Sequence, residues 1–148
     1  MIRQATKYDI EKIIQMLKNY RNESPIDKLR EANDRNHVVN LLLQIFAGRG
    51  VVFYAEECDE PAGMLMAMVM PNFWFPQMYE LHELAYWVEK KYRGGSVGYR
   101  LLKNYCDYGE QLKKQKRIDF YTVSKMVNSP DLKYQKFGFN KLEEKWIQ

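Results

Sequence analysis

A glycine-rich turn between an apolar stretch and an amphipathic helix constrains this chain more than any other feature. The apolar stretch Leu84 to Val88 ends in charged residues, the turn follows at Arg93-Gly94-Gly95-Ser96, and the helix begins near Val97. Glycines let the backbone approach a ligand closely, and the first N–H groups of a helix have no partner within the helix. The helix dipole adds about half a positive charge at that end. The sequence therefore predicts a cradle for an anion, and a diphosphate suits it.

Two common nucleotide-binding signatures do not match this turn. A Walker loop requires a lysine directly after its last glycine, and no lysine follows Gly98. A dinucleotide-binding fingerprint needs G-x-G-x-x-G in the first strand–helix unit, whereas this turn lies past the midpoint of the chain, after segments typical of antiparallel strands. The turn is therefore predicted to bind a diphosphate of another kind.

The spacing Arg93-x-x-Ser96-x-Gly98 resembles the R/Q-x-x-G-x-G/A signature of the GNAT acyl-CoA N-acyltransferases. In that family the loop holds the pyrophosphate of coenzyme A. Ser96 stands where the signature usually has glycine, but serine still offers its backbone N–H. The resemblance implies acetyl-CoA as the cosubstrate and no metal. The cofactor-binding residues that it implies are Tyr86, Val88, Arg93, Gly94, Gly95, Ser96, Val97, Gly98 and Asn128.

A second segment resembles the same family. Tyr134-Gln135-Lys136-Phe137-Gly138-Phe139 is similar to the Y-x-K-x-G-F element that closes the GNAT cofactor site, about forty residues after the loop. Ser129 is a suitable helix cap, Pro130 suits the first turn, and Gly138 suits the end of a short helix. The resemblance implies that Tyr134 protonates the departing CoA thiolate.

Further segments extend the resemblance over nearly the whole chain. Ile2 to Asp9 reads I-R-x-A-T-x-x-D, a start that is common in GNAT proteins. Glu83 to Val88 resembles the E-L-x-W-W-V strand of a GNAT subgroup frequent in bacteriophage genomes. That subgroup also carries elements similar to Glu23-Ser24-Pro25 and to the aromatic residues after Pro71. The resemblance therefore implies a phage-type member of the family.

Periodicity and turn signals predict one α+β domain over residues 1–148. We expect strands at 2–6, 51–56, 62–70, 81–88, 118–123 and 139–147, and helices at 7–20, 34–46, 96–112 and 130–137. The resemblance implies the GNAT fold, with a central mixed sheet of six to seven strands and helices on both faces. In that fold the strands expected at 81–88 and 118–123 splay apart, and the pantetheine arm of CoA lies between them.

Acyl transfer to an amine requires a general base, because an amine with a pKa near ~10 is almost fully protonated at neutral pH. Glu83 is the favoured base, with Glu80, His82 or a bound water as alternatives. Strict alternation along the strand places Glu83 with Ala85 and Trp87, and His82 on the other face. The resemblance implies that the backbone N–H of Val88 holds the oxyanion.

The net charge is +4, and the basic residues form two clusters. The first comprises Lys90, Lys91, Arg93, Arg100 and Lys103, and we expect it to steer a polyanionic cofactor. The second comprises Lys113, Lys114, Lys116 and Arg117. A solvated helix face explains this second cluster as well as a role in binding does. Nucleic acid is a further polyanion, but no helix-turn-helix, zinc or RNP signature supports it.

The aromatic loop Pro71 to Pro76 is too apolar to be expected fully exposed to solvent. It is expected to line the acceptor pocket, to form a homodimer contact or to cover the sheet edge. The longest apolar stretch, Ala62 to Met70, is about half the length needed to cross a bilayer, so no membrane partner is expected. Cys58 and Cys106 show neither metal nor redox spacing, which favours reduced thiols in a cytoplasm, that of the host for a phage protein.

Two functions from different classes are compatible with the sequence. The first is an acetyl-CoA-dependent N-acetyltransferase that moves the acetyl group to a primary amine by direct attack in a ternary complex. The second is a GNAT-shaped module that binds CoA or a partner with little catalysis, such as a phage factor acting on a host protein or on DNA. The sequence does not identify the acceptor, which is a small molecule or a protein in the first case.

Overall fold

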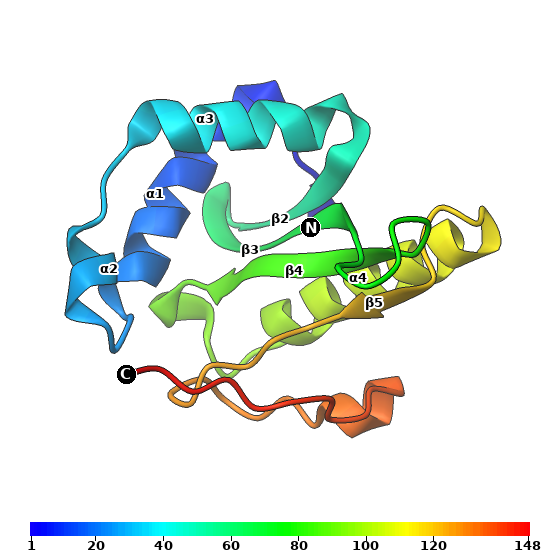
Figure 1. Ribbon diagram of the computed structural model, residues 1–148. Coiled ribbons are helices and arrows are strands. Elements are labelled where there is room, and N and C mark those ends of the chain that lie inside the picture. Colours follow the sequence, from blue (N-terminus) through cyan, green and yellow to red (C-terminus); the bar gives the residue numbers. More distant parts are fainter.

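A mixed five-stranded sheet forms the centre of the structure, a computed structural model that describes residues 1–148 (Figure 1). The strands lie in chain order, and the first four are antiparallel while the fifth runs parallel to the fourth. They are β1 (Ile2–Gln4), β2 (Gly50–Glu57), β3 (Glu60–Pro71), β4 (Tyr79–Val88) and β5 (Phe120–Thr122). The expected α+β architecture is confirmed, but the prediction of six to seven strands is wrong.

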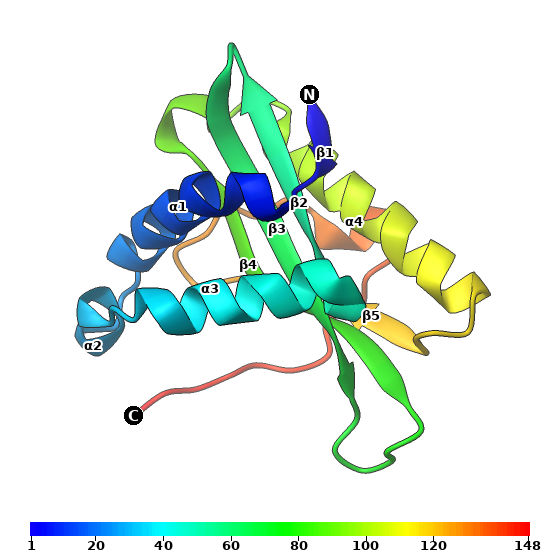
Figure 2. The same cartoon turned by 90° about the horizontal axis from the view of Figure 1, so that it is seen from above.

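Helices cover both faces of this sheet, as predicted (Figure 2). Helices α1 (Ile10–Asn22) and α3 (Arg35–Gln44) lie on one face, and α4 (Val97–Lys114) lies on the other. Each face buries its own apolar cluster, one beneath α4 and one beneath α1 and α3. The short helix α2 (Asp27–Glu31) was not predicted, because five residues are too few to show a helical period. No helix of the chain is both long and apolar enough to cross a bilayer.

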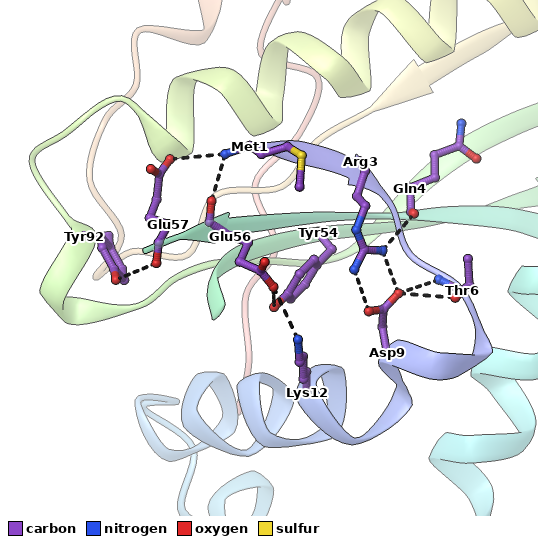
Figure 3. Close-up of polar contacts among 10 residues, drawn as sticks. All are labelled: Met1, Arg3, Gln4, Thr6, Asp9, Lys12, Tyr54, Glu56, Glu57 and Tyr92. Atoms are coloured by element: carbon purple, nitrogen blue, oxygen red, sulfur yellow. Dashed lines mark hydrogen bonds and ion pairs between the residues drawn. The ribbon is translucent and has the colours of Figure 1, made fainter. Parts of the chain in front are cut away.

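Polar contacts hold the first strand and the first helix together (Figure 3). Arg3 donates to both carboxylate oxygens of Asp9, each at 2.8 Å, and Asp9 completes a capping box with Thr6. Asp9 is buried, and the hydrogen bonds from Arg3 hold its pKa at about 2. The ion pair therefore replaces the water that a buried carboxylate would otherwise need, and it places β1 beside α1.

The C-terminal part departs from the sequence prediction. The helix expected at 130–137 is reduced to a single 3-10 turn at Tyr134–Phe137, because Lys133 before it adopts a left-handed conformation with φ of 54°. The strand expected at 139–147 is absent, and those residues form no regular structure. The edge strand β5 has only three residues, so it offers a short ladder for another strand to join.

A β-bulge at Leu84 decides which way the candidate base points. Ala85 lies opposite Met66 of β3, whereas Glu83 lies opposite the next residue, Ala67, so Leu84 has no partner. Residues directly opposite each other in an antiparallel pair share a face of the sheet. Ala67 belongs to the core beneath α4, so Glu83 lies on the α4 face. The prediction from strict alternation is wrong, because the bulge adds one residue to β4.

Candidate active site between strands β4 and β5

The sheet opens between its two parallel strands. Pairs join β4 to β5 only from Glu80 to His82, opposite Phe120 to Thr122. Strand β4 continues to Val88, but β5 has ended by then, and the following chain runs away from the sheet (Figure 1). The predicted splay is therefore present, and it leaves the last six residues of β4, Glu83 to Val88, without a neighbour on that side.

A tyrosine from α4 marks the point where the strands part. The Tyr105 side chain is fully buried, and its hydroxyl lies within hydrogen-bond distance of the carbonyl oxygens of Leu81, at 3.1 Å, and of Thr122. These two carbonyls belong to β4 and β5 respectively. Gly109, one turn further along α4, lets the helix approach Tyr121 of β5, since an added Cβ would lie 2.6 Å from that ring. Tyr105 was not predicted as a site residue, although its place on the apolar face of the helix was a usable signal.

Backbone groups at the end of β4 face the opening. Glu89 N–H donates to Ala62 O at 2.9 Å, so the preceding residue, Val88, occupies a position that does not hydrogen bond to β3. Its N–H and C=O therefore point to the side on which β5 has ended. The Val88 carbonyl accepts from Arg93 Nε at 2.9 Å, while the N–H has no strand to pair with. By the same alternation, the backbone of Tyr86 faces the opening.

The Glu83 carboxylate lies at the mouth of the splay. It is buried, with 6% of the residue exposed, and it accepts a hydrogen bond from the Ser124 N–H at 3.0 Å. Burial raises the pKa of Glu83 from its ordinary value to about 7, while the Ser124 hydrogen bond opposes that shift. Such a carboxylate is ready to accept a proton near neutral pH. Ser124 was not among the predicted site residues, because its role depends on where the chain turns after β5.

The two alternative bases lie on the other face of β4. His82 lies opposite Met68, which packs against the cluster beneath α1 and α3, and its Nδ1 lies 3.2 Å from a carboxylate oxygen of Glu80. Both side chains are partly exposed. They pair with each other and lie away from the α4 face that holds Glu83, so the geometry favours Glu83 over both.

Tyr134 reaches the same gap from the 3-10 turn. Its half-buried ring packs against the core beneath α4 and lies edge-on to Phe139, with ring centroids 6.4 Å apart. Burial, and secondly the nearby charge of Glu83, raise the pKa of Tyr134 to about 12. The structure thus brings Glu83, Tyr86 and Tyr134 together on one side of the opening.

The glycine loop presents a row of free donors. The first backbone hydrogen bond of α4 joins Arg100 N to Ser96 O at 2.9 Å, and the N–H groups from Gly94 to Tyr99 donate to no acceptor within the chain. Gly94 has φ of +83°, a conformation that side chains rarely adopt. A hollow of about 370 Å³ lies beside this row, and Cys58 lies on its rim. Cys58 was not predicted to lie at this site.

Two of the predicted cofactor residues have other partners in the chain. Arg93 donates to both carboxylate oxygens of Glu23, at 3.2 and 3.0 Å, and its guanidinium lies over the Trp87 ring, 4.6 Å from the centroid. Asn128 donates through Nδ2 to Glu23 O at 3.1 Å. Glu23, at the end of α1, thus accepts hydrogen bonds from both Arg93 and Asn128. This role of Glu23 was not predicted.

Every basic side chain of the first cluster has a carboxylate partner. Lys90 and Arg93 pair with Glu23, Lys91 with Glu60, Arg100 with Glu57, and Lys103 with Asp107. The full positive charges that the sequence suggests for steering are therefore largely neutralised. What remains for an anion is the row of backbone N–H groups and the start of the helix.

A mixed sheet that opens between two parallel strands, beside a helix start with unpartnered N–H donors, has the architecture of an acetyltransferase. The model of the acetyltransferase (GNAT) family matches residues 12–139, and the chain belongs to this family. No curated protein matches the chain.

Solved structures share the fold over the whole chain. The aminoglycoside acetyltransferase meta-AAC0020, from an uncultured soil metagenomic sample, has 17% identity and a TM-score of 0.69, with 100% of this chain and 92% of that chain covered. A predicted acetyltransferase from Clostridium acetobutylicum, solved with acetyl-CoA, has 17% identity and a TM-score of 0.67, with coverage of 100% and 94%. Glucosamine-6-phosphate N-acetyltransferase from Arabidopsis thaliana has 14% identity and a TM-score of 0.69, with coverage of 100% and 96%.

Proposed function

We propose that this protein is an acetyl-CoA-dependent N-acetyltransferase that moves an acetyl group to a primary amine by direct attack within a ternary complex. The observation that carries the proposal is the Glu83 carboxylate. It is buried at the opening of the sheet with a pKa near 7, next to backbone donors that have no partner in the chain. A carboxylate placed in this way is suited to general base catalysis.

The free donors fit a CoA-type cosubstrate. The N–H groups from Gly94 to Tyr99 would hold the diphosphate, because they converge at the positive end of α4. The backbone of Tyr86 would hold the pantetheine arm along the open edge of β4, and the Val88 N–H remains free for the thioester carbonyl. When bound, acetyl-CoA supplies the thioester acetyl group.

The side chains divide the proton transfers between them. Glu83 takes a proton from the acceptor ammonium, directly or through a water, and so frees the amine for attack. The Val88 N–H stabilises the negative charge that develops on the carbonyl oxygen. Tyr134, with a pKa of about 12, stays protonated, donates to the leaving thiolate and recovers the second proton that the attacking nitrogen loses. A thiolate with a pKa near ~8.5 is a weaker base than the phenolate, so the help from Tyr134 is modest.

The acceptor is proposed as an amine on a sugar or an aminoglycoside-like molecule. Two of the similar folds are named for such acceptors, an aminoglycoside acetyltransferase and a glucosamine-6-phosphate N-acetyltransferase. We further propose a cytoplasmic site of action, consistent with the free thiols of Cys58 and Cys106. The motifs at Glu23-Ser24-Pro25 and Glu83 to Val88 support a phage-type member of the family.

Calorimetry with acetyl-CoA, followed by a panel of amines with thiol release as the readout, tests the proposal. We expect acetyl-CoA to bind and to raise the melting temperature, while NAD and ATP shift it much less. At least one aminoglycoside or amino sugar should then release thiol. Binding without thiol release across the panel would favour the module with little catalysis, and stabilisation by ATP but not by acetyl-CoA would overturn both readings.

A further inference from the structure

The hairpin between β3 and β4 ends in an exposed aromatic tip, which we define as residues 72–75. Phe73 is 88% exposed, Trp74 is 86% exposed and Phe75 is 51% exposed. Figure 2 shows this hairpin projecting beyond the helices that cover the sheet. The rings of the tip are thus exposed and do not cover the edge of the sheet, which was one of the three roles expected for this loop.

The tip is ordered by hydrogen bonds of its own. The side-chain oxygen of Asn72 accepts from the N–H groups of Trp74, at 2.8 Å, and of Phe75, at 3.3 Å. Asn72 N–H donates to Met78 O at 2.7 Å, and the rings of Phe73 and Trp74 meet edge to face, 5.0 Å between centroids. The backbone thus holds two large rings outward, ready to insert into an apolar medium without further ordering.

A group of unpaired basic residues lies at the same end of the molecule. Tyr79, at the base of the hairpin, exchanges hydrogen bonds with Asp119 at 3.0 and 2.8 Å. Arg117, two residues before Asp119, donates to Gly48 O at 3.2 Å and so joins the end of α4 to the segment before β2. We define the basic rim as the four residues Arg49, Lys114, Lys116 and Arg117 at this end of the molecule. No carboxylate lies in salt-bridge contact with any of them.

Basic residues outnumber acidic residues at this end. No charged residue occurs between Pro61 and Tyr79, and the nearest acids are already engaged, Glu80 with His82 and Asp119 with the Tyr79 N–H. The basic cluster around the glycine loop differs, because all its members are paired. Four basic residues without a carboxylate partner thus lie at the same end of the molecule as its two most exposed aromatic rings.

We propose that the aromatic tip and the basic rim bind an anionic lipid surface. Tryptophan and phenylalanine partition into the boundary between headgroups and acyl chains, and lysine and arginine are attracted to anionic headgroups. Beyond Asn72 and the indole N–H of Trp74, the tip offers only aromatic rings and no charged side chain, which suits the boundary of a bilayer better than a protein partner. The glycine loop lies at the opposite end of β4 from the tip, so a bound surface leaves it open to solvent.

Co-sedimentation with vesicles tests this proposal. We expect the protein to bind vesicles that contain phosphatidylglycerol and not vesicles of phosphatidylcholine alone, and to be released by high salt. The double variant Phe73→Ser/Trp74→Ser should abolish binding, while its melting temperature and its acetyl-CoA affinity stay unchanged. Lys114→Gln/Lys116→Gln should weaken binding by about tenfold or more. The matched control Lys18→Gln/Lys28→Gln removes two exposed lysines from α1 and α2 and should leave binding intact.

Bromine-labelled lipids give a second readout, because they quench a tryptophan that enters the bilayer. Quenching should be lost in Trp74→Phe even if that variant still binds. Three outcomes would overturn the proposal. They are no binding to anionic vesicles, binding that the tip variant does not reduce, and light scattering that shows a dimer which the tip variant breaks. Retention of single-stranded DNA without any vesicle binding would assign the same end to nucleic acid instead.

Discussion

Arg93 on the glycine loop donates two hydrogen bonds to the carboxylate of Glu23 at the end of α1, at 3.2 and 3.0 Å, although the two residues are 70 positions apart in the sequence. The same guanidinium donates to Val88 O at 2.9 Å. The arginine of the signature therefore connects α1, the end of β4 and the loop. It positions the donors of the loop, and its charge is already matched by a carboxylate.

Arg93→Ala should lower the free energy of unfolding by about 1 kcal/mol and weaken acetyl-CoA binding only a few fold. Both partners are about a third exposed, so the pair itself is worth little, and the hydrogen bond to Val88 O adds to it. A double-mutant cycle with Glu23→Gln, followed by denaturant unfolding, measures the coupling. A hundredfold loss of affinity at unchanged stability would show instead that Arg93 contacts the diphosphate directly.

Gly98→Val should weaken acetyl-CoA binding strongly and leave the fold intact. An added Cβ at Gly98 lies 3.4 Å from Tyr86 Oη and 3.6 Å from Val88 Cγ2, which are ordinary contacts, so the helix can still form. The branched side chain would, however, occupy the space beside the free N–H groups. Calorimetry and thermal melting measure the two effects, with Gly98→Ala as the milder control. An unchanged affinity for the valine variant would rule out the cradle.

Glu83→Gln should stabilise the protein at alkaline pH and not at acid pH. The folded-state pKa of Glu83 is raised by burial to about 7, so ionising it costs folding free energy as the pH rises from about 4.5 through 7. Glutamine removes that cost, which is on the order of 3 kcal/mol at pH 8, and can keep the hydrogen bond from Ser124. Melting curves of both proteins at pH 4 and pH 8 test this. A difference of equal size at the two pH values would mean that Glu83 titrates normally.

The pH dependence of kcat/KM should separate the base from the acid. In the wild-type enzyme the rate should rise as the pH passes about 7 and Glu83 ionises. Glu83→Gln should reduce the rate by ~10²-fold near neutrality and recover partly at high pH, where the acceptor amine is free. The control is an unchanged affinity for acetyl-CoA. A wild-type profile in this variant would assign the role to a bound water.

Tyr134→Phe should reduce kcat by a modest factor at every pH, without rescue at high pH. The substitution keeps the ring that packs near Phe139 and removes only the hydroxyl. A pKa near 12 means that the wild-type hydroxyl stays protonated over the whole assay range. Steady-state kinetics with thiol detection gives the comparison. If the variant instead lost acetyl-CoA affinity by more than tenfold, Tyr134 would act in binding.

Tyr105→Phe should destabilise the protein by about 1–3 kcal/mol and impair the site as well. The hydroxyl lies within reach of the Leu81 and Thr122 carbonyls, and its loss leaves buried acceptors unsatisfied at the point where β4 and β5 part. Denaturant unfolding gives the free energy of unfolding, and hydrogen exchange of the β5 amides shows whether the pairing of β4 with β5 becomes less stable. Tyr108→Phe, on the same helix but without a hydroxyl contact, is the matched control.

Much of the site follows from short stretches of sequence. The glycine loop and the start of α4 depend on residues within a few positions of each other, and the structure has both as predicted. The family motifs at the loop and at Tyr134 also lie in continuous segments. Local conformational preferences act over this range, so a sequence alone can determine such features.

The tertiary structure alone decided the rest. The bulge at Leu84 depends on how β4 meets β3, and it moves Glu83 to the α4 face. The pairing of Arg93 with Glu23 depends on which helix end comes to rest beside the loop. Residues after Phe139 form no strand, and β5, the edge strand that such a strand would have to join, is only three residues long. Register, ion pairs and edge length all depend on contacts between distant segments, and no periodicity within one segment contains that information.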